Sequence, residues 1–148
     1  MKYFIFIVAV SFCHLIATAQ TSVQKFVYHQ AIIKDVATDK VVEDFGYENK
    51  GVILFYKKGN SEWISVSLGT EEVYSIKVVQ IINDFPNKDI KVEMSKGGVM
   101  KDDQCIGTIA VFRIYDLTKN KSIPEFIRTQ VDNASIAFEF NGIIRIEN

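Results

Sequence analysis

The sequence has few of the residues that build metal sites, disulfides or catalytic centres. It contains two cysteines, two histidines and two prolines in 148 residues. Cys13 and His14 lie in an apolar N-terminal run that we expect to be removed, which leaves His29 and Cys105. One histidine and one cysteine cannot fill a tetrahedral zinc site without carboxylates, and a lone cysteine cannot form an internal disulfide. We therefore expect no metal, no cofactor and a fold that depends on apolar burial, with Cys105 as a buried small hydrophobe.

An excess of charge of either sign is also missing. The chain has 17 basic and 18 acidic residues, a net charge of −1, and its lysines are separated by acids. This pattern argues against nucleic-acid binding. Lys96-Gly97-Gly98 lacks the order of a phosphate-binding loop, so we expect a turn between strands there. Asp102-Asp103 lacks the spacing of a calcium loop, so we expect it to be solvated.

The first residues have the three parts of an export signal. Lys2 gives a positive end, Tyr3 to Ile16 is almost entirely apolar, and Ala17-Thr18-Ala19 has the small-x-small pattern of a cleavage site. The apolar run of about 14 residues is shorter than the ~20 needed to span a bilayer. We predict a signal peptide over residues 1–19 and a single domain over 20–148. The protein would then be exported, to a periplasm, cell surface or extracellular space, with no membrane span, and the Phe, Ile and Lys bias looks bacterial.

Two hairpins are the clearest local predictions. Ser135 to Phe140 alternates, Asn141-Gly142 is a typical type I′ turn pair, and Ile143 to Glu147 would return as the second strand. Gly51 to Tyr56 and Ser61 to Leu68 flank a turn at residues 57–60, and the alternation places Trp63 opposite Ile64.

Most of the remaining chain is also typical of strands. Strands are expected at Val23 to Ile33, from Val41, at Asp89 to Met94 and at Cys105 to Tyr115. Thr70 to Phe85 has helical spacing, but its β-branched residues favour a strand. Ser122 to Asp132 fits a capped helix and a strand equally well.

These elements predict a mainly β fold. Sequential hairpins imply an antiparallel meander, which hides its edges by curling into a small barrel or a sandwich, with zero to two short helices; the alternative is an α+β fold.

No motif supports catalysis, so we lean to a protein that is not an enzyme. A curled meander can enclose a cavity, which suggests a non-catalytic binding module, for example for a small apolar ligand. The alternative is a cell-envelope or surface protein that contacts another protein or has a structural role; a small secreted hydrolase is a third reading. The candidate ligand or partner surface is an aromatic group near the second hairpin: Phe45, Tyr47, Phe55, Tyr56 and Trp63.

Overall fold

The computed structural model describes residues 23–47, 50–69, 71–120 and 122–147, and this part of the chain consists of strands and turns without a helix. The predicted signal peptide, residues 1–19, lies outside the described residues. The strands are β1 (Gln24–Tyr28), β2 (Gln30–Asp35), β3 (Val41–Asp44), β4 (Gly51–Lys58), β5 (Ser61–Leu68), β6 (Glu71–Asn87), β7 (Ile90–Lys101), β8 (Gln104–Asp116), β9 (Phe126–Val131), β10 (Ile136–Asn141) and β11 (Ile144–Ile146).

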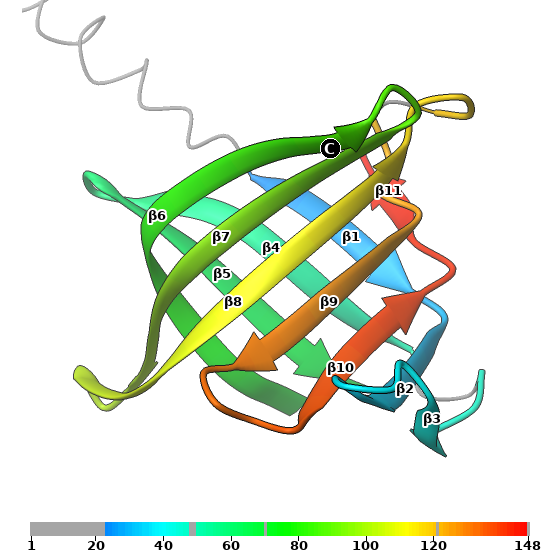
Figure 1. Ribbon diagram of the computed structural model, residues 1–148. Coiled ribbons are helices and arrows are strands. Elements are labelled where there is room, and N and C mark those ends of the chain that lie inside the picture. Colours follow the sequence, from blue (N-terminus) through cyan, green and yellow to red (C-terminus); the bar gives the residue numbers. More distant parts are fainter. Residues whose placement is uncertain (1–22, 48–49, 70, 121, 148) are drawn as a thin grey trace, which may run out of the picture.

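The described strands form one antiparallel sheet, which confirms the predicted mainly β fold. Each strand from β4 to β9 pairs with the next one along the chain, so the stretch from β4 to β10 is a meander. Figure 1 shows the sheet curled on itself, with β6 to β10 in front and β1, β4 and β5 behind. The curl places one face of every long strand toward a common interior.

Two bent segments hold the ends of the curled sheet against each other. Only His29 separates β1 from β2, yet β1 pairs with β4 and β11 whereas β2 pairs with β10 and β3. The hydrogen-bonded ladder is not closed, because β11 and β3 are its two ends. The backbone at His29 joins β1 near one end of the sheet to β2 near the other end. There the His29 backbone N–H donates to the Asn141 carbonyl oxygen at 3.0 Å.

The predicted hairpin at Asn141-Gly142 is wrong. β10 and β11 do not pair with each other; both run beside the bent β1–β2 segment, β10 against β2 and β11 against β1. A type I′ turn needs a positive φ at both central residues. Only Gly142 has one, at 64°. A single left-handed residue bends the strand instead of reversing it.

Other local predictions are confirmed. The hairpin of β4 and β5 turns at Gly59-Asn60, with a φ of 60° at Gly59. In the segment predicted from Thr70 to Phe85, the described residues from Glu71 onward belong to the strand β6, in line with their β-branched side chains. The ambiguous segment Ser122 to Asp132 becomes a loop followed by β9, and there the helical alternative is wrong. Paired strands on both sides of β9 supply the hydrogen bonds that decide between the two patterns.

The interior is filled by side chains from eight of the described strands. Tyr28 and Phe26 are the largest, and the buried core comprises Phe26, Tyr28, Ala31, Ile53, Ile64, Val66, Ile76, Ile109, Val111, Ile127 and Phe140. Inside this core the Tyr28 hydroxyl donates to the Ser67 carbonyl at 2.6 Å, and the Tyr74 and Thr129 hydroxyls share a hydrogen bond of 2.7 Å.

The predicted turn at Lys96-Gly97-Gly98 is wrong, because these residues lie in the middle of β7. Here glycine permits close packing rather than chain reversal. A Cβ on Gly97 would lie 2.2 Å from the Lys77 carbonyl oxygen on β6. A glycine pair can indicate either a turn or a place where two strands approach closely, so the sequence alone does not distinguish the two.

Candidate ligand-binding site

A hollow of about 250 Å³ lies at the end of the curled sheet where β1 begins and β4 turns into β5. At ~30 Å³ per water, this space corresponds to roughly eight water molecules. Its apolar wall is formed by Phe55, Ile64, Val78 and Ile81. Ile64 also belongs to the packed core, so the hollow borders on that core.

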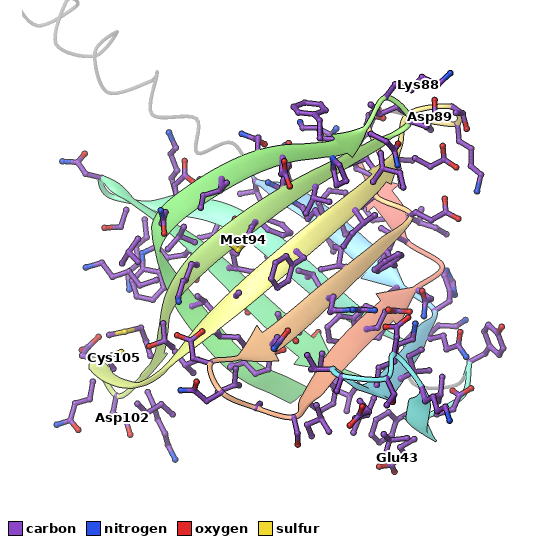
Figure 2. All side chains as sticks on the ribbon, viewed as in Figure 1. Glu43, Lys88, Asp89, Met94, Asp102 and Cys105 are labelled. Carbon is purple, nitrogen blue, oxygen red and sulfur yellow. The ribbon has the colours of Figure 1, made fainter. Side chains whose placement is uncertain are left out.

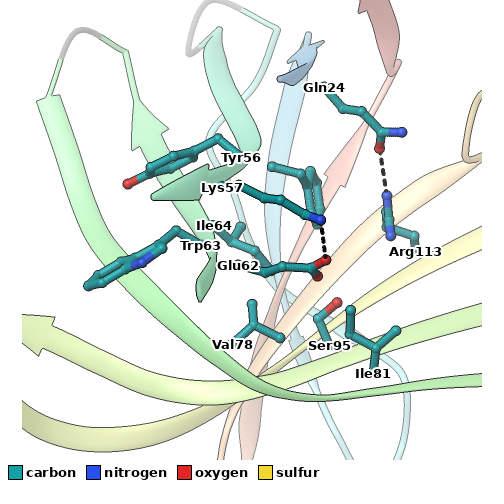
Figure 3. A pocket seen from close by; sticks show the side chains of 11 residues that line it. Gln24, Tyr56, Lys57, Glu62, Trp63, Ile64, Val78, Ile81, Ser95 and Arg113 are labelled. Atoms are coloured by element: carbon teal, nitrogen blue, oxygen red, sulfur yellow. Dashed lines mark hydrogen bonds and ion pairs between the residues drawn. The ribbon is translucent and has the colours of Figure 1, made fainter. Parts of the chain in front are cut away.

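Strand register decides which of the predicted aromatic residues face this hollow. Phe55 pairs with the buried Ile64, so both side chains point inward. Tyr56 pairs with Trp63, one step along each strand, and these rings therefore lie on the outer face of the same hairpin. Figure 3 shows them extending away from Lys57 and Glu62. Trp63 therefore lies on the opposite face of β5 from Ile64, as the alternation predicted.

The other two predicted residues lie elsewhere. Phe45 stacks on Phe138, with ring centroids 6.5 Å apart, and packs against the core. Tyr47 is 70 % exposed. The structure thus brings Phe55, Tyr56 and Trp63 together around the second hairpin and leaves Phe45 and Tyr47 apart from them.

Polar groups converge on the inner side of the hollow, and the sequence analysis did not identify them. The Arg113 guanidinium donates through Nη1 to Gln24 Oε1 at 3.0 Å, as drawn in Figure 3, and lies 2.8 Å through Nη2 from Glu93 Oε2. Its Cζ lies 4.3 Å from the centre of the Phe55 ring, a cation–π contact. Glu93 also accepts from Lys91 and, at 3.1 Å, from the Tyr115 hydroxyl.

These contacts set the charge states of the group. Burial by itself would raise the pKa of Glu93, but the hydrogen bond from Lys91 and the charges of Arg113 and Lys91 lower that pKa below its ordinary value. Burial raises the pKa of Tyr115 to about 12, which the Arg113 charge partly opposes. At neutral pH the group therefore holds a carboxylate, two cations and a neutral phenol.

One nitrogen of Arg113 lacks a hydrogen-bond partner. Its Nε is buried and has no hydrogen-bond partner among the described residues, although a buried N–H ordinarily has one. The side chain is 13 % exposed and lines the hollow. A signal for it existed in the sequence: Arg113 shares parity with Val111, Ile109 and Tyr115, so a charge sits on the buried face of a strand.

The residues considered for other chemistry do not form a site. Cys105 is exposed beside the β7–β8 turn, so the expectation that it is buried is wrong. Figure 2 shows it near Asp102, at the opposite end of the sheet from Lys88 and Asp89. His29 occupies the bend between β1 and β2 and is far in sequence from Cys105 and Asp102. No group of three or more metal-ligating side chains occurs within the described ranges.

A second hollow, of about 320 Å³, lies under the loop between β8 and β9. Its charged groups satisfy one another, since Lys119 Nζ lies 3.0 Å from Glu125 and 3.5 Å from Asp116. The hollow beside Arg113 is therefore the better candidate. In the described residues, no helix has the length and apolarity to cross a membrane.

No family model, no curated protein and no solved structure matches this chain. Its class rests on the fold and the hollow alone: a small mainly β protein whose curled antiparallel sheet is open at one end.

Proposed function

We propose that this protein is a non-catalytic binding module that holds a small molecule in the hollow beside Arg113. The observation that carries the proposal is the combination of an apolar wall and convergent polar groups in one concave space, the usual character of a ligand site. Phe55 and Ile81 supply apolar surface, and Gln24, Ser95 and Arg113 supply polar atoms.

The size of the hollow supports a compact ligand. About 250 Å³ is below the usual range of about 300–1,000 Å³ for ligand pockets. Because the interior beyond it is filled by Tyr28, Phe26 and their neighbours, a long ligand would have to extend outward past the rim formed by Lys57 and Glu62.

Filling the hollow tests the proposal. Ile81 lines it and pairs with the buried Ser95, whereas the next residue, Ile82, pairs with Met94 on the other face. We expect the neutral fluorophore N-phenyl-1-naphthylamine to brighten on binding the wild-type protein and the Ile82→Trp variant, and to lose most of this signal with Ile81→Trp. A wild-type protein that does not brighten the probe, or an Ile81→Trp variant that binds it normally, contradicts the proposal.

A second candidate, contact with another protein, is favoured by the free edge of β6. Pairing with β5 ends at Lys77, whereas pairing with β7 continues to Asn87. On this edge Val79 is 76 % exposed and Phe85 is 59 % exposed. Exposed apolar edges are the sites at which another chain adds a strand. If they do so here, Val79→Lys with Phe85→Lys should abolish self-association or partner capture, and unchanged sedimentation and capture would exclude this candidate.

A further inference from the structure

The second half of β6 has a neighbouring strand on one side only. Among the described residues, pairing with β5 stops at Lys77, whereas pairing with β7 continues to Asn87. Each of residues 79–89 is exposed, although side chains alternate between the two faces of a strand. In Figure 1 this half of β6 forms the upper margin of the sheet. Its backbone edge and both of its faces are therefore accessible to another strand.

The two ends of the sheet are protected against such pairing, and the β6 edge is not protected in the same way. β11 has three residues and contains Arg145, and β3 has four residues and contains Glu43 and Asp44. Short length and charge are the usual means by which an edge strand avoids another chain. Residues 79–87 of β6 carry one charge, at Asp84. The same stretch contains the exposed apolar side chains of Val79, Ile81, Ile82 and Phe85.

The regular part of this free edge is the segment Gln80–Asp84. The register with β7 shifts between Val78 and Gln80 and again between Asp84 and Asn87, and the second irregularity includes Pro86, which has no N–H to donate. Irregularities of this kind interrupt strand pairing. A strand added to the edge is thus confined to the five residues between them.

This segment is complementary to a second copy of itself. In an antiparallel pair of identical strands related by a two-fold axis, the residue on the axis lies opposite its own copy. With the axis at Ile82, Gln80 lies opposite Asp84, and Ile81 lies opposite Asn83. The Gln80 amide can then donate to the Asp84 carboxylate of the other copy, the two Ile82 side chains meet, and no like charges face each other.

We infer that the β6 edge binds a second copy of this chain, in an antiparallel dimer whose two-fold axis passes through Ile82. This inference rests on the second candidate function, contact through the β6 edge, and is independent of a ligand in the hollow. An axis at Ile81 would bring the irregular Val79 into the pairing, and an axis at Asn83 would place Ile82 against Asp84. The register at Ile82 alone uses all five regular residues.

Charges placed on the axis test the dimer. Wild type should sediment as a dimer at about 0.1 mM, a concentration that populates even a dimer of micromolar affinity. Ile82→Lys and Ile82→Glu should each weaken association about tenfold or more, because like charges then lie directly opposite each other. An equimolar mixture of the two variants should associate again. Ile136→Lys, at an isoleucine of similar exposure on β10, should associate as the wild type does.

The outcomes separate this inference from the proposed functions. A monomeric wild type, or variants that are folded by circular dichroism and remain apart when mixed, overturns the dimer. A monomer that captures a different protein through this edge also overturns it and leaves the second candidate function standing. Ile82→Lys should still brighten N-phenyl-1-naphthylamine, because Ile82 lies on the other face from the hollow.

A disulfide test fixes the register. In a Cys105→Ser background, Ile82→Cys should form a disulfide-linked dimer on mild oxidation, because directly opposite residues lie within disulfide reach. Ile81→Cys should not, since the two copies of residue 81 are then diagonal neighbours and farther apart. Cross-linking of Ile81→Cys but not of Ile82→Cys shows that the assigned axis is wrong.

Discussion

Glu93→Gln is the most informative test of the charged group, because it removes the carboxylate that Lys91 and Arg113 share while it keeps the side-chain shape. Breaking a fully buried ion pair costs about 3–5 kcal/mol, and a surface pair is worth less than about 1 kcal/mol. The Glu93 side chain is 17 % exposed and contacts both Lys91 and Arg113. A value between these limits applies, so we expect a loss of about 2 kcal/mol in the free energy of unfolding near pH 7.

The pH dependence follows from the direction of the pKa shift. The folded pKa of Glu93 is below its ordinary value of 4.5, so the ionised form stabilises the fold above that value. This contribution is lost as the pH falls through the lowered pKa. The difference between wild type and Glu93→Gln should therefore be largest near pH 7 and should shrink as the pH falls below 4.5 and through the lowered pKa of the wild-type group.

Urea denaturation at several pH values measures both quantities. The control is Glu62→Gln, which also removes a carboxylate next to a lysine; Glu62 is 46 % exposed and 4.0 Å from Lys57, so the loss should be below about 0.5 kcal/mol. The reasoning is refuted if Glu93→Gln is as stable as the wild type near pH 7, or if its deficit does not change with pH.

Three further outcomes are expected. Tyr28→Phe should lower the free energy of unfolding by about 1–2 kcal/mol, because the Ser67 carbonyl loses a buried hydrogen bond, whereas Tyr47→Phe, at an exposed ring, should not change it in urea denaturation. Gly97→Ala should cost about 2 kcal/mol or more, since its Cβ would overlap a backbone oxygen of β6; a melting temperature equal to that of the wild type would contradict this. Cys105 is exposed, so it should react with Ellman's reagent almost as fast in the folded protein as in urea; a thiol protected until the protein unfolds would contradict its placement.

Local sequence patterns predicted the fold correctly wherever a single turn determined which strands pair. Gly59-Asn60 reverses the chain between two alternating strands, and the structure has that hairpin. Asn141-Gly142 carries a similar signal but bends a strand, because the partner of that strand is the β1–β2 segment more than a hundred residues away in sequence. Pairing with a strand so distant in sequence determines the conformation at Asn141-Gly142, and the neighbouring residues do not indicate it.

The site was less accessible than the fold. Aromatic residues drew attention to the second hairpin, and Phe55 does line the hollow. The charged group was missed because its members come from β1, β7 and β8, and each is unremarkable in its own segment. Only the register shows that Glu93 and Arg113 are paired on the inner face. The sequence signal for this group is a charged residue that shares strand parity with buried neighbours, as Arg113 does.

The bent β1–β2 segment also constrains how the molecule is made. Val27 pairs with Ile144 across the ladder, so β1 has no neighbour on that side until β11 has been synthesised. Folding that awaits such distant pairing is slow, and an unpaired strand is open to aggregation meanwhile. A nascent chain stalled before residue 144 would expose this edge of β1, and pairing with β11 ends that exposure.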